Sequence, residues 1–264
     1  MSLVIVGYFF SLLGTGLIIY FFEYMYLKKL FYWTIPLYII GLLIVIDILY
    51  FLFLVICNYS LSKKRLQKPS RFARYLITEY AYFVDFKMRI IPKAHASIKN
   101  CKGVFIFNHR SLLDPLALES YFRFQSPFYI MKKEIVNWPF AGRLIVKAGS
   151  VCIDREDLRQ SVRALQEAKE KMRNRNLGIF PEGTRNKTEE AILPFKPGAL
   201  KIAYQAKADV NVVKLVNFKK AIWNRFRFKK IHPEIFLLKT FTYEEYKDMT
   251  TEAFSEVIEN LYRK

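Results

Sequence analysis

With 264 residues, 53% of them hydrophobic, the chain can bury one sizeable core and carry a small appendage, which argues against two large domains. Its formal net charge of +19 lies entirely beyond residue 60, because the two acids and two lysines before that point cancel. Such a charge favours anionic partners, whether lipid headgroups, a nucleotide-bearing thioester, an acidic carrier protein or nucleic acid. The three cysteines, at positions 57, 101 and 152, have neither paired nor metal-ligand spacing. No internal repeat or low-complexity tract is visible.

Two long apolar segments open the chain. Residues 3–22 are uncharged over about 20 residues, the length that crosses a bilayer, and lack the basic leader and cleavage site of a signal peptide. Residues 30–57 form a second apolar run, interrupted only by Asp47, which is expected to be protonated, partnered or near an interface. The sequence therefore predicts an N-terminal membrane-embedded helical hairpin over residues 1–60. Insertion into a single leaflet stays open as an alternative to a full span.

Basic residues crowd the far side of the second apolar segment, between positions 63 and 74. By the positive-inside rule, residues 61–264 are expected on the cytoplasmic face of the cell membrane. Residues 71–90 mix aromatic side chains with arginines. They are expected to form either an amphipathic helix at the headgroup level or an ordinary helix that packs on the domain.

Short apolar runs alternate with helical stretches beyond residue 100. Strands are expected at residues 103–107, 128–131, 150–153, 177–180, 210–216 and 234–239. A core-packing helix is indicated by Leu158, Val162, Leu165 and Met172, with Asp154 as its N-cap. Residues 254–261 indicate a closing amphipathic helix. This alternation predicts an α/β domain with a mostly parallel sheet flanked by helices and its functional loops at one edge.

The first candidate motif follows the expected strand at residues 103–107. His109 would emerge where that strand ends, and Asp114 lies five residues later. A carboxylate bonded to one ring nitrogen fixes the tautomer that leaves the other nitrogen free to take a proton. Five residues is a poor spacing for contact on a regular helix, but Pro115 favours a loop or loose turn that brings the two together.

The second candidate motif, Phe-Pro-Glu-Gly-Thr-Arg at residues 180–185, follows the expected strand at 177–180. Gly183 allows close approach of the backbone to a ligand. Arg185 offers donors suited to a phosphate, and Glu182 can accept a hydrogen bond from a glycerol-like hydroxyl. The alternative is a surface turn with a glutamate–arginine ion pair.

Together, the two motifs resemble the glycerolipid acyltransferase family, most closely its 1-acylglycerol-3-phosphate acyltransferases. That family carries Asn-His-x-x-x-x-Asp and then Phe-Pro-Glu-Gly-Thr-Arg, which match residues 108–114 and 180–185. Residues 131–135, 139–142, 149–155 and 193–199 resemble the family's other blocks. The resemblance covers roughly residues 85–217. The chain departs from the family at residues 210–214, where Asn211 and Lys214 stand in a strand that usually holds prolines.

The resemblance implies transfer of an acyl group from an acyl-CoA or acyl-carrier-protein thioester to the sn-2 hydroxyl of 1-acyl-sn-glycerol 3-phosphate, forming phosphatidic acid. His109 would be the base and Asp114 its partner, with no cofactor and no metal. The expected substrate contacts come from six residues, with Lys132 serving the acceptor phosphate or the oxyanion unless it is merely solvated: Glu182, Gly183, Thr184, Arg185, Arg155 and Lys132.

Three alternatives remain. The acceptor could be a lysophospholipid, a lyso-amino-acid lipid or glycerol 3-phosphate. A non-enzymatic binder of anionic membrane lipids or nucleic acid would explain the charge but leaves both ordered motifs without a purpose, so nucleic acid is not an expected partner. A metal-dependent phosphohydrolase would need more ligands than His109 and Asp114 supply.

Overall fold

The computed structural model describes residues 14–18, 34–63, 73–79, 81, 93–94, 98–111, 114–122, 127–137, 142–154, 156–188, 190–196, 198–217 and 233–263. The chain divides into two compact units, Met1–Arg65 and Leu66–Lys264.

The first unit contains the long helix α2 (Thr34–Lys63), which covers most of the second apolar segment. Large apolar side chains are exposed on it, among them Ile40, Ile44, Ile48 and Leu52. Of the first apolar segment, residues 14–18 are described, and they are helical. None of the helices in the described ranges is identified as a membrane span by its length and apolarity.

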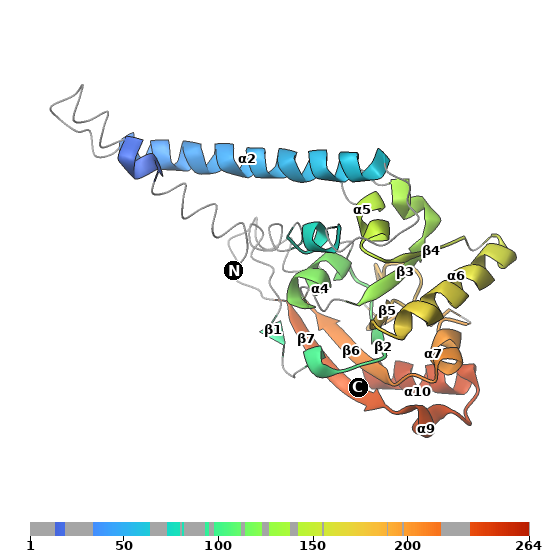
Figure 1. Cartoon of the computed structure of the whole chain (residues 1–264). Helices are drawn as coiled ribbons and strands as arrows, with labels where there is room; N and C mark the ends of the chain where they lie inside the picture. The colour runs from blue at the N-terminus through green and yellow to red at the C-terminus, as the bar shows by residue number, and fades with distance from the viewer. Residues whose placement is uncertain are drawn as a thin grey trace. The chain divides into compact units, whose positions relative to one another are not determined.

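The second unit is built on a sheet of seven described strands (Figure 1). The strands are β1 (Lys93–Ala94), β2 (Val104–Phe107), β3 (Phe128–Lys132), β4 (Val151–Ile153), β5 (Leu177–Ile179), β6 (Val210–Val216) and β7 (Glu234–Phe241). Their order is β1-β7-β6-β2-β5-β3-β4. Every neighbouring pair is parallel except β6 and β7. The prediction of a mostly parallel sheet is therefore confirmed. Strands β2 to β7 lie within a few residues of the expected ranges, whereas the two-residue strand β1 was not expected.

Helices cover both faces of this sheet. They are α4 (Asp114–Phe122), α5 (Gly142–Lys147), α6 (Leu158–Met172), α7 (Lys201–Ala206), α9 (Tyr243–Tyr246) and α10 (Thr251–Arg263), with 3-10 turns at Ile98–Asn100 and Lys133–Asn137. Successive side chains of strand β2 point to opposite faces of the sheet. All four are buried because helices cover both faces. Val104 and Ile106 pack with α6, α7 and α10, whereas Phe105 and Phe107 pack with α4.

Helix α6 forms where expected, but two details of the prediction are wrong. Its N-cap is Asp157, whose side chain accepts a hydrogen bond from the backbone N–H of Gln160 at 3.0 Å. Asp154 lies too close to the end of β4 to cap the helix. The fully buried positions are small residues, Ala164 and Ala168, and Leu165 and Met172 pack against the core as expected. Leu158 and Val162 are instead 79% and 48% exposed.

The helical residues 73–79 and 81 decide between the two expectations for residues 71–90. Leu76, Ile77 and Ala81 are buried, and Thr78 donates a hydrogen bond to Glu119 of α4 at 3.1 Å. The described part of this helix therefore packs on the domain. This agrees with the expectation of an ordinary packing helix and not with that of a helix at the headgroup level.

Strand β6 explains how the chain accommodates Asn211 and Lys214. An internal strand needs its backbone N–H groups for the ladder, and these residues supply them where proline could not. The buried amide of Asn211 donates to the carbonyl of Lys102 at 2.8 Å and accepts from the hydroxyl of Thr240 at 2.9 Å. Lys214 Nζ donates to the carbonyl of Tyr262 at 3.0 Å. Asn211 thus links neighbouring segments of the sheet, and Lys214 links the sheet to helix α10 (Thr251–Arg263).

Candidate active site

The two sequence motifs meet at the carboxyl ends of neighbouring parallel strands. Strand β2 pairs with β5 so that Ile106 lies opposite Ile179. His109 and Glu182 each follow these partners by three residues, and the carboxyl edge of a parallel sheet is where α/β proteins place their ligands. The backbone N–H of Asn186 also donates to the carbonyl of His109 at 2.7 Å, so the two loops are joined directly.

His109 and Asp114 form the expected pair. Nδ1 of the imidazole lies 3.0 Å from Oδ2 of Asp114. The same oxygen accepts from the backbone N–H groups of Arg110 and Ser111, both at 2.7 Å. Asp114 is fully buried at the start of α4, while the side chain of His109 is 18% exposed. The non-helical loop allows the five-residue spacing, and Nε2 is left as the nitrogen that can exchange a proton.

Glu182 of the second motif is buried and bonds to the backbone of the first motif. One carboxylate oxygen accepts from the backbone N–H of His109 at 2.6 Å, and the other accepts from the backbone N–H of Leu193 at 2.9 Å. The residue is 1% exposed. Burial raises the pKa of the Glu182 carboxyl above its usual value of 4.5, although the two backbone hydrogen bonds act in the opposite direction. The structure thus gives Glu182 an internal role that was not expected, and its contact with a glycerol hydroxyl stays a prediction.

The imidazole is fixed by packing as well as by hydrogen bonds. The ring of Phe180 lies against it, with centroids 4.5 Å apart, and is itself backed by Phe107 and Tyr129. Asn108, one residue before His109, is buried and exchanges two hydrogen bonds with the backbone of Leu215, at 2.7 and 3.0 Å. The amide side chain thereby extends the pairing of β2 with β6 beyond the strand end.

The end of the second motif, Thr184 and Arg185, faces solvent. Gly183 has a φ of 67°, and its N–H closes a turn onto the carbonyl of Phe180 at 3.0 Å. Thr184 and Arg185 are exposed and continue from this turn. Lys132, at the carboxyl end of β3, is exposed on the same edge of the sheet. Arg155 lies outside the described residues. The expected phosphate-binding groups that are described therefore occupy the accessible rim of the site.

Three supporting residues escaped the sequence analysis as site residues. They are Asn108, Asn186 and Tyr262. Tyr262 lies on α10, far along the chain, and its buried hydroxyl is within hydrogen-bonding distance of the carbonyls of Ile106, at 2.8 Å, and Val213, at 3.0 Å. Only the position of Asn108 next to the histidine could have signalled such a role; Tyr262 reads as one more apolar position of an amphipathic helix.

Within the described ranges, no group of three or more His, Cys, Asp or Glu side chains could hold a metal ion. The chemistry available at this edge is that of an oriented imidazole: it can take a proton from a bound hydroxyl and return it to a leaving group.

Comparison with known proteins agrees with this geometry. Residues 89–216 match the family model described as acyltransferase, a range that contains both motifs. Over this range the chain is similar to the acyltransferase family. A protein named 1-acyl-sn-glycerol-3-phosphate acyltransferase from Helicobacter pylori is 43% identical over 115 residues, which cover 43% of this chain and 48% of that protein. One of the same name from Borreliella burgdorferi is 29% identical over 184 residues, covering 66% and 72%.

Another such acyltransferase, from Cocos nucifera, is 30% identical over 169 residues and is covered over 54% of its length. The chain thus spans about half the length of the relatives from Helicobacter pylori and Cocos nucifera, 48% and 54%. The crystal structure of the 1-acyl-sn-glycerophosphate acyltransferase from Thermotoga maritima has the same fold, with a TM-score of 0.56 at 21% identity. That likeness covers 83% of this chain and 92% of that structure.

Proposed function

We propose that this protein is an acyltransferase that moves a fatty acyl group from an acyl thioester to the sn-2 hydroxyl of 1-acyl-sn-glycerol 3-phosphate, forming phosphatidic acid. The observation that carries the proposal is the buried Asp114 carboxylate 3.0 Å from Nδ1 of His109, in a loop bonded to the second motif. An imidazole so held is suited to general-base catalysis. The names of the similar proteins supply the substrate class.

In this mechanism Nε2 of His109 takes the proton of the acceptor hydroxyl while that oxygen attacks the thioester carbonyl. Asp114 stabilises the imidazolium that forms. The tetrahedral intermediate then expels the thiolate, which takes the proton from the imidazolium, so no group on the protein is consumed. The acceptor is itself the nucleophile, and no acyl-enzyme is needed. The donor is the co-substrate, and the reaction as written uses no further cofactor or metal.

The exposed rim would bind the phosphate of the acceptor. Arg185 offers a planar set of donors, and the backbone at Gly183 and the hydroxyl of Thr184 adjoin it. Lys132 would serve the phosphate or the oxyanion, and Arg155 is a further candidate for the phosphate. We assign Glu182 the role of positioning His109, and not of contacting the glycerol, because its carboxylate oxygens accept hydrogen bonds from backbone amides.

The N-terminal unit would attach the enzyme to the membrane that holds its lipid substrate. Helix α2 exposes isoleucine and leucine side chains along its length, which is unfavourable in water. The basic residues that follow it favour contact with anionic lipids and the cytoplasmic face of the cell membrane.

An acceptor panel tests the proposed reaction. The purified full chain would be given acyl-CoA and, in turn, 1-acylglycerol 3-phosphate, 1-acylglycerol, lysophosphatidylcholine and glycerol 3-phosphate, with products identified by mass spectrometry. Phosphatidic acid should form with the highest kcat/KM, and 1-acylglycerol, which lacks only the phosphate, should be a poor acceptor. Equal use of these two acceptors would contradict the proposed phosphate site.

A further inference from the structure

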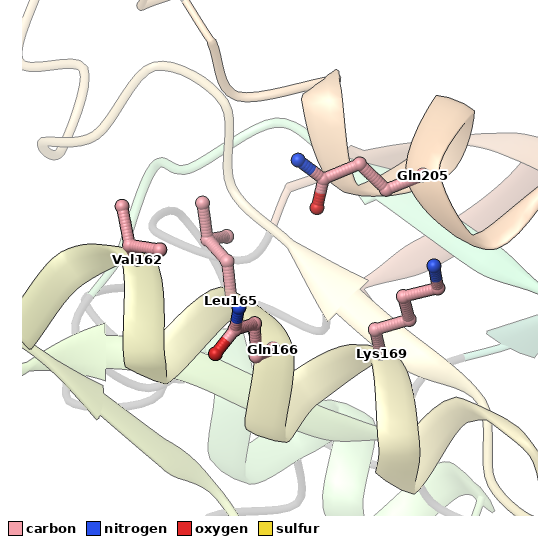
Figure 2. A pocket seen from close by; sticks show the side chains of 5 residues that line it. All are labelled: Val162, Leu165, Gln166, Lys169 and Gln205. Carbon is pink, nitrogen blue, oxygen red and sulfur yellow. The ribbon is translucent and has the colours of Figure 1, made fainter.

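Helix α6 exposes an apolar strip that the core does not use. Leu158, at 79%, is the most exposed large apolar side chain in the described part of residues 66–264, and Val162 follows one turn later. Leu165 continues the strip toward a hollow between α6 and α7. Figure 2 shows this hollow, lined by Val162, Leu165, Gln166 and Lys169 of α6 and by Gln205 of α7. Leu165 also packs partly against the core, but Leu158 and Val162 do not, so the exposed part of the strip calls for another explanation.

Positive charge borders the same strip. Two of the basic residues at the end of α6 are paired: Lys171 with Glu167 at 2.7 Å, and Arg173 with Glu170 at 3.6 Å. Arg159, Arg163 and Lys169 are exposed, and among the described residues no ion pair involves them. An exposed apolar strip with unpaired cations beside it is complementary to an acidic surface with apolar side chains of its own.

The strip begins at the edge of the sheet that carries the active site. Strands β2, β5, β3 and β4 are parallel, so their carboxyl ends share one edge. Helix α6 starts five residues after β4 ends, which places Leu158 and Arg159 at that edge. Strand β4 is three strands from β2, or about 14 Å at about 4.8 Å per strand. A partner on α6 would therefore lie within a short distance of His109.

The shape of the strip favours a protein over a membrane. From Leu158 to Lys169 it runs along the helix axis for about 17 Å, at 1.5 Å per residue, away from the active-site edge. A flat bilayer laid against that edge would touch only the start of α6. A partner that also fills the hollow at Gln205 has to lie along the helix, as the helix of a second protein does.

We propose that this face of α6 is the docking site for a small acidic carrier protein that delivers the acyl group as its thioester; the inference rests on the proposed function. The partner's carboxylates pair with Arg159, Arg163 and Lys169, and its apolar side chains cover Leu158 and Val162. Docking there presents the thioester to His109 from the carboxyl edge of the sheet.

The test compares two donors that carry the same acyl chain, acyl-CoA and an acyl carrier protein, on the purified full chain with 1-acylglycerol 3-phosphate. In Arg159→Glu/Arg163→Glu, KM for the carrier-protein donor should rise about tenfold or more, while kcat/KM for acyl-CoA stays within about twofold. Leu158→Ser/Val162→Ser should act in the same direction. The matched control is Lys102→Glu/Lys207→Glu, an equal charge change at exposed positions that precede β2 and β6.

The outcomes separate the alternatives. Turnover of acyl-CoA by the unaltered protein tests the proposed reaction independently of the docking site. If the unaltered protein does not use the carrier-protein donor, or if the α6 variants lose both donors equally, the docking proposal is overturned while the reaction stands. The proposal is also overturned if the variants keep carrier-protein activity but lose binding to phosphatidylglycerol–phosphatidylcholine vesicles, because the strip would then be a membrane contact.

Discussion

The candidate active site has two halves that differ in burial. In the buried half, formed by Asn108, Asp114 and Glu182, side-chain oxygens accept hydrogen bonds from backbone amides. In the exposed half, formed by Thr184, Arg185 and Lys132, side chains reach solvent. Apart from Lys132, both halves come from the same two short motifs, so neighbours in sequence have different tasks. The buried half fixes where His109 lies, and the exposed half is left to meet the substrate.

The difference has a physical origin in the strand ends. A loop that leaves a sheet has backbone N–H groups without ladder partners, and a buried amide without a partner destabilises the fold. Asp114 and Glu182 satisfy such amides at residues 109–111 and 193. Gly183 then turns the chain outward at a φ of 67°, after which Thr184 and Arg185 are exposed. Variants of the two halves should consequently fail in different ways.

Among the variants that keep the imidazole, Asp114→Asn should produce the largest effect. The asparagine carbonyl can keep the bonds to the backbone of Arg110 and Ser111, but the charge that stabilises the imidazolium is lost. We expect kcat to fall about 10²- to 10⁴-fold, the range of general-base contributions, with a smaller change in KM. Steady-state kinetics with the preferred acceptor measures this. A variant within about threefold of the parent would break the assignment of Asp114 as partner of the base.

Arg185→Ala should affect binding without affecting the fold. Loss of a charge-assisted hydrogen bond to a phosphate corresponds to about 1.5–3 kcal/mol, or roughly a 10- to 100-fold rise in KM for the phosphorylated acceptor. The melting temperature should stay unchanged because the side chain is exposed. Lys187→Ala, two residues further along and equally exposed, is the control. Equal effects of the two variants would remove Arg185 from the phosphate site.

Glu182→Gln should affect the fold and the rate together. A glutamine has one acceptor oxygen, so one of the backbone N–H groups of His109 and Leu193 loses its partner, at a cost of about 1–3 kcal/mol in the free energy of unfolding. Chemical denaturation measures this cost, and kcat should fall with it. Glu190→Gln, an exposed acid in the same loop, should change neither quantity. If Glu182→Gln raised only KM, the result would favour direct contact of Glu182 with the glycerol over positioning of His109.

The pKa of Glu182 also predicts how stability depends on pH. Because burial raises the pKa of this carboxyl in the folded state, the native protein binds the proton more tightly than the unfolded chain does. Its contribution to stability is full below the unfolded value near 4.5 and is lost as pH rises through the higher folded pKa. Denaturation midpoints across this range should fall less steeply in Glu182→Gln than in the parent. An identical slope in both proteins would argue against a raised pKa.

Tyr262→Phe should have the smallest effect. It removes a hydroxyl that lies within hydrogen-bonding distance of the carbonyls of Ile106 in β2 and Val213 in β6. The expected cost is about 1 kcal/mol in the free energy of unfolding. The ring stays packed, so kcat should fall only slightly. Tyr204→Phe, whose hydroxyl makes a single longer bond of 3.4 Å, is the matched control and should cost less. The reverse ranking would show that α10 does not support the strand ends.

Much of this architecture could be predicted from the sequence because periodicity and chain order determine it. The apolar runs located the strands, and the strand ends brought His109, Asp114 and residues 180–185 together at one edge. The role of Glu182 could not be predicted in this way, since a carboxylate that binds substrate and one that binds backbone amides look alike in sequence. Tyr262 depends on a contact between residues 156 positions apart, which no local pattern encodes.

Helix α6 shows the same limit in its packing. Its apolar periodicity predicted that Leu158 and Val162 belong to the core, yet Ala164 and Ala168 form the buried face. Small residues let the helix approach the sheet closely, and the larger side chains are then left outside. Periodicity locates an amphipathic helix but does not state which of its apolar residues meet the core.

The most direct test of the central claim is the rate of phosphatidic acid formation by His109→Ala. The full chain and this variant would be assayed with acyl-CoA and 1-acylglycerol 3-phosphate, after matching melting temperatures establish that both are folded. With the imidazole as the base, kcat should fall by about 10²- to 10⁴-fold while KM for both substrates changes little. A folded variant that forms phosphatidic acid at the parent rate would contradict the account.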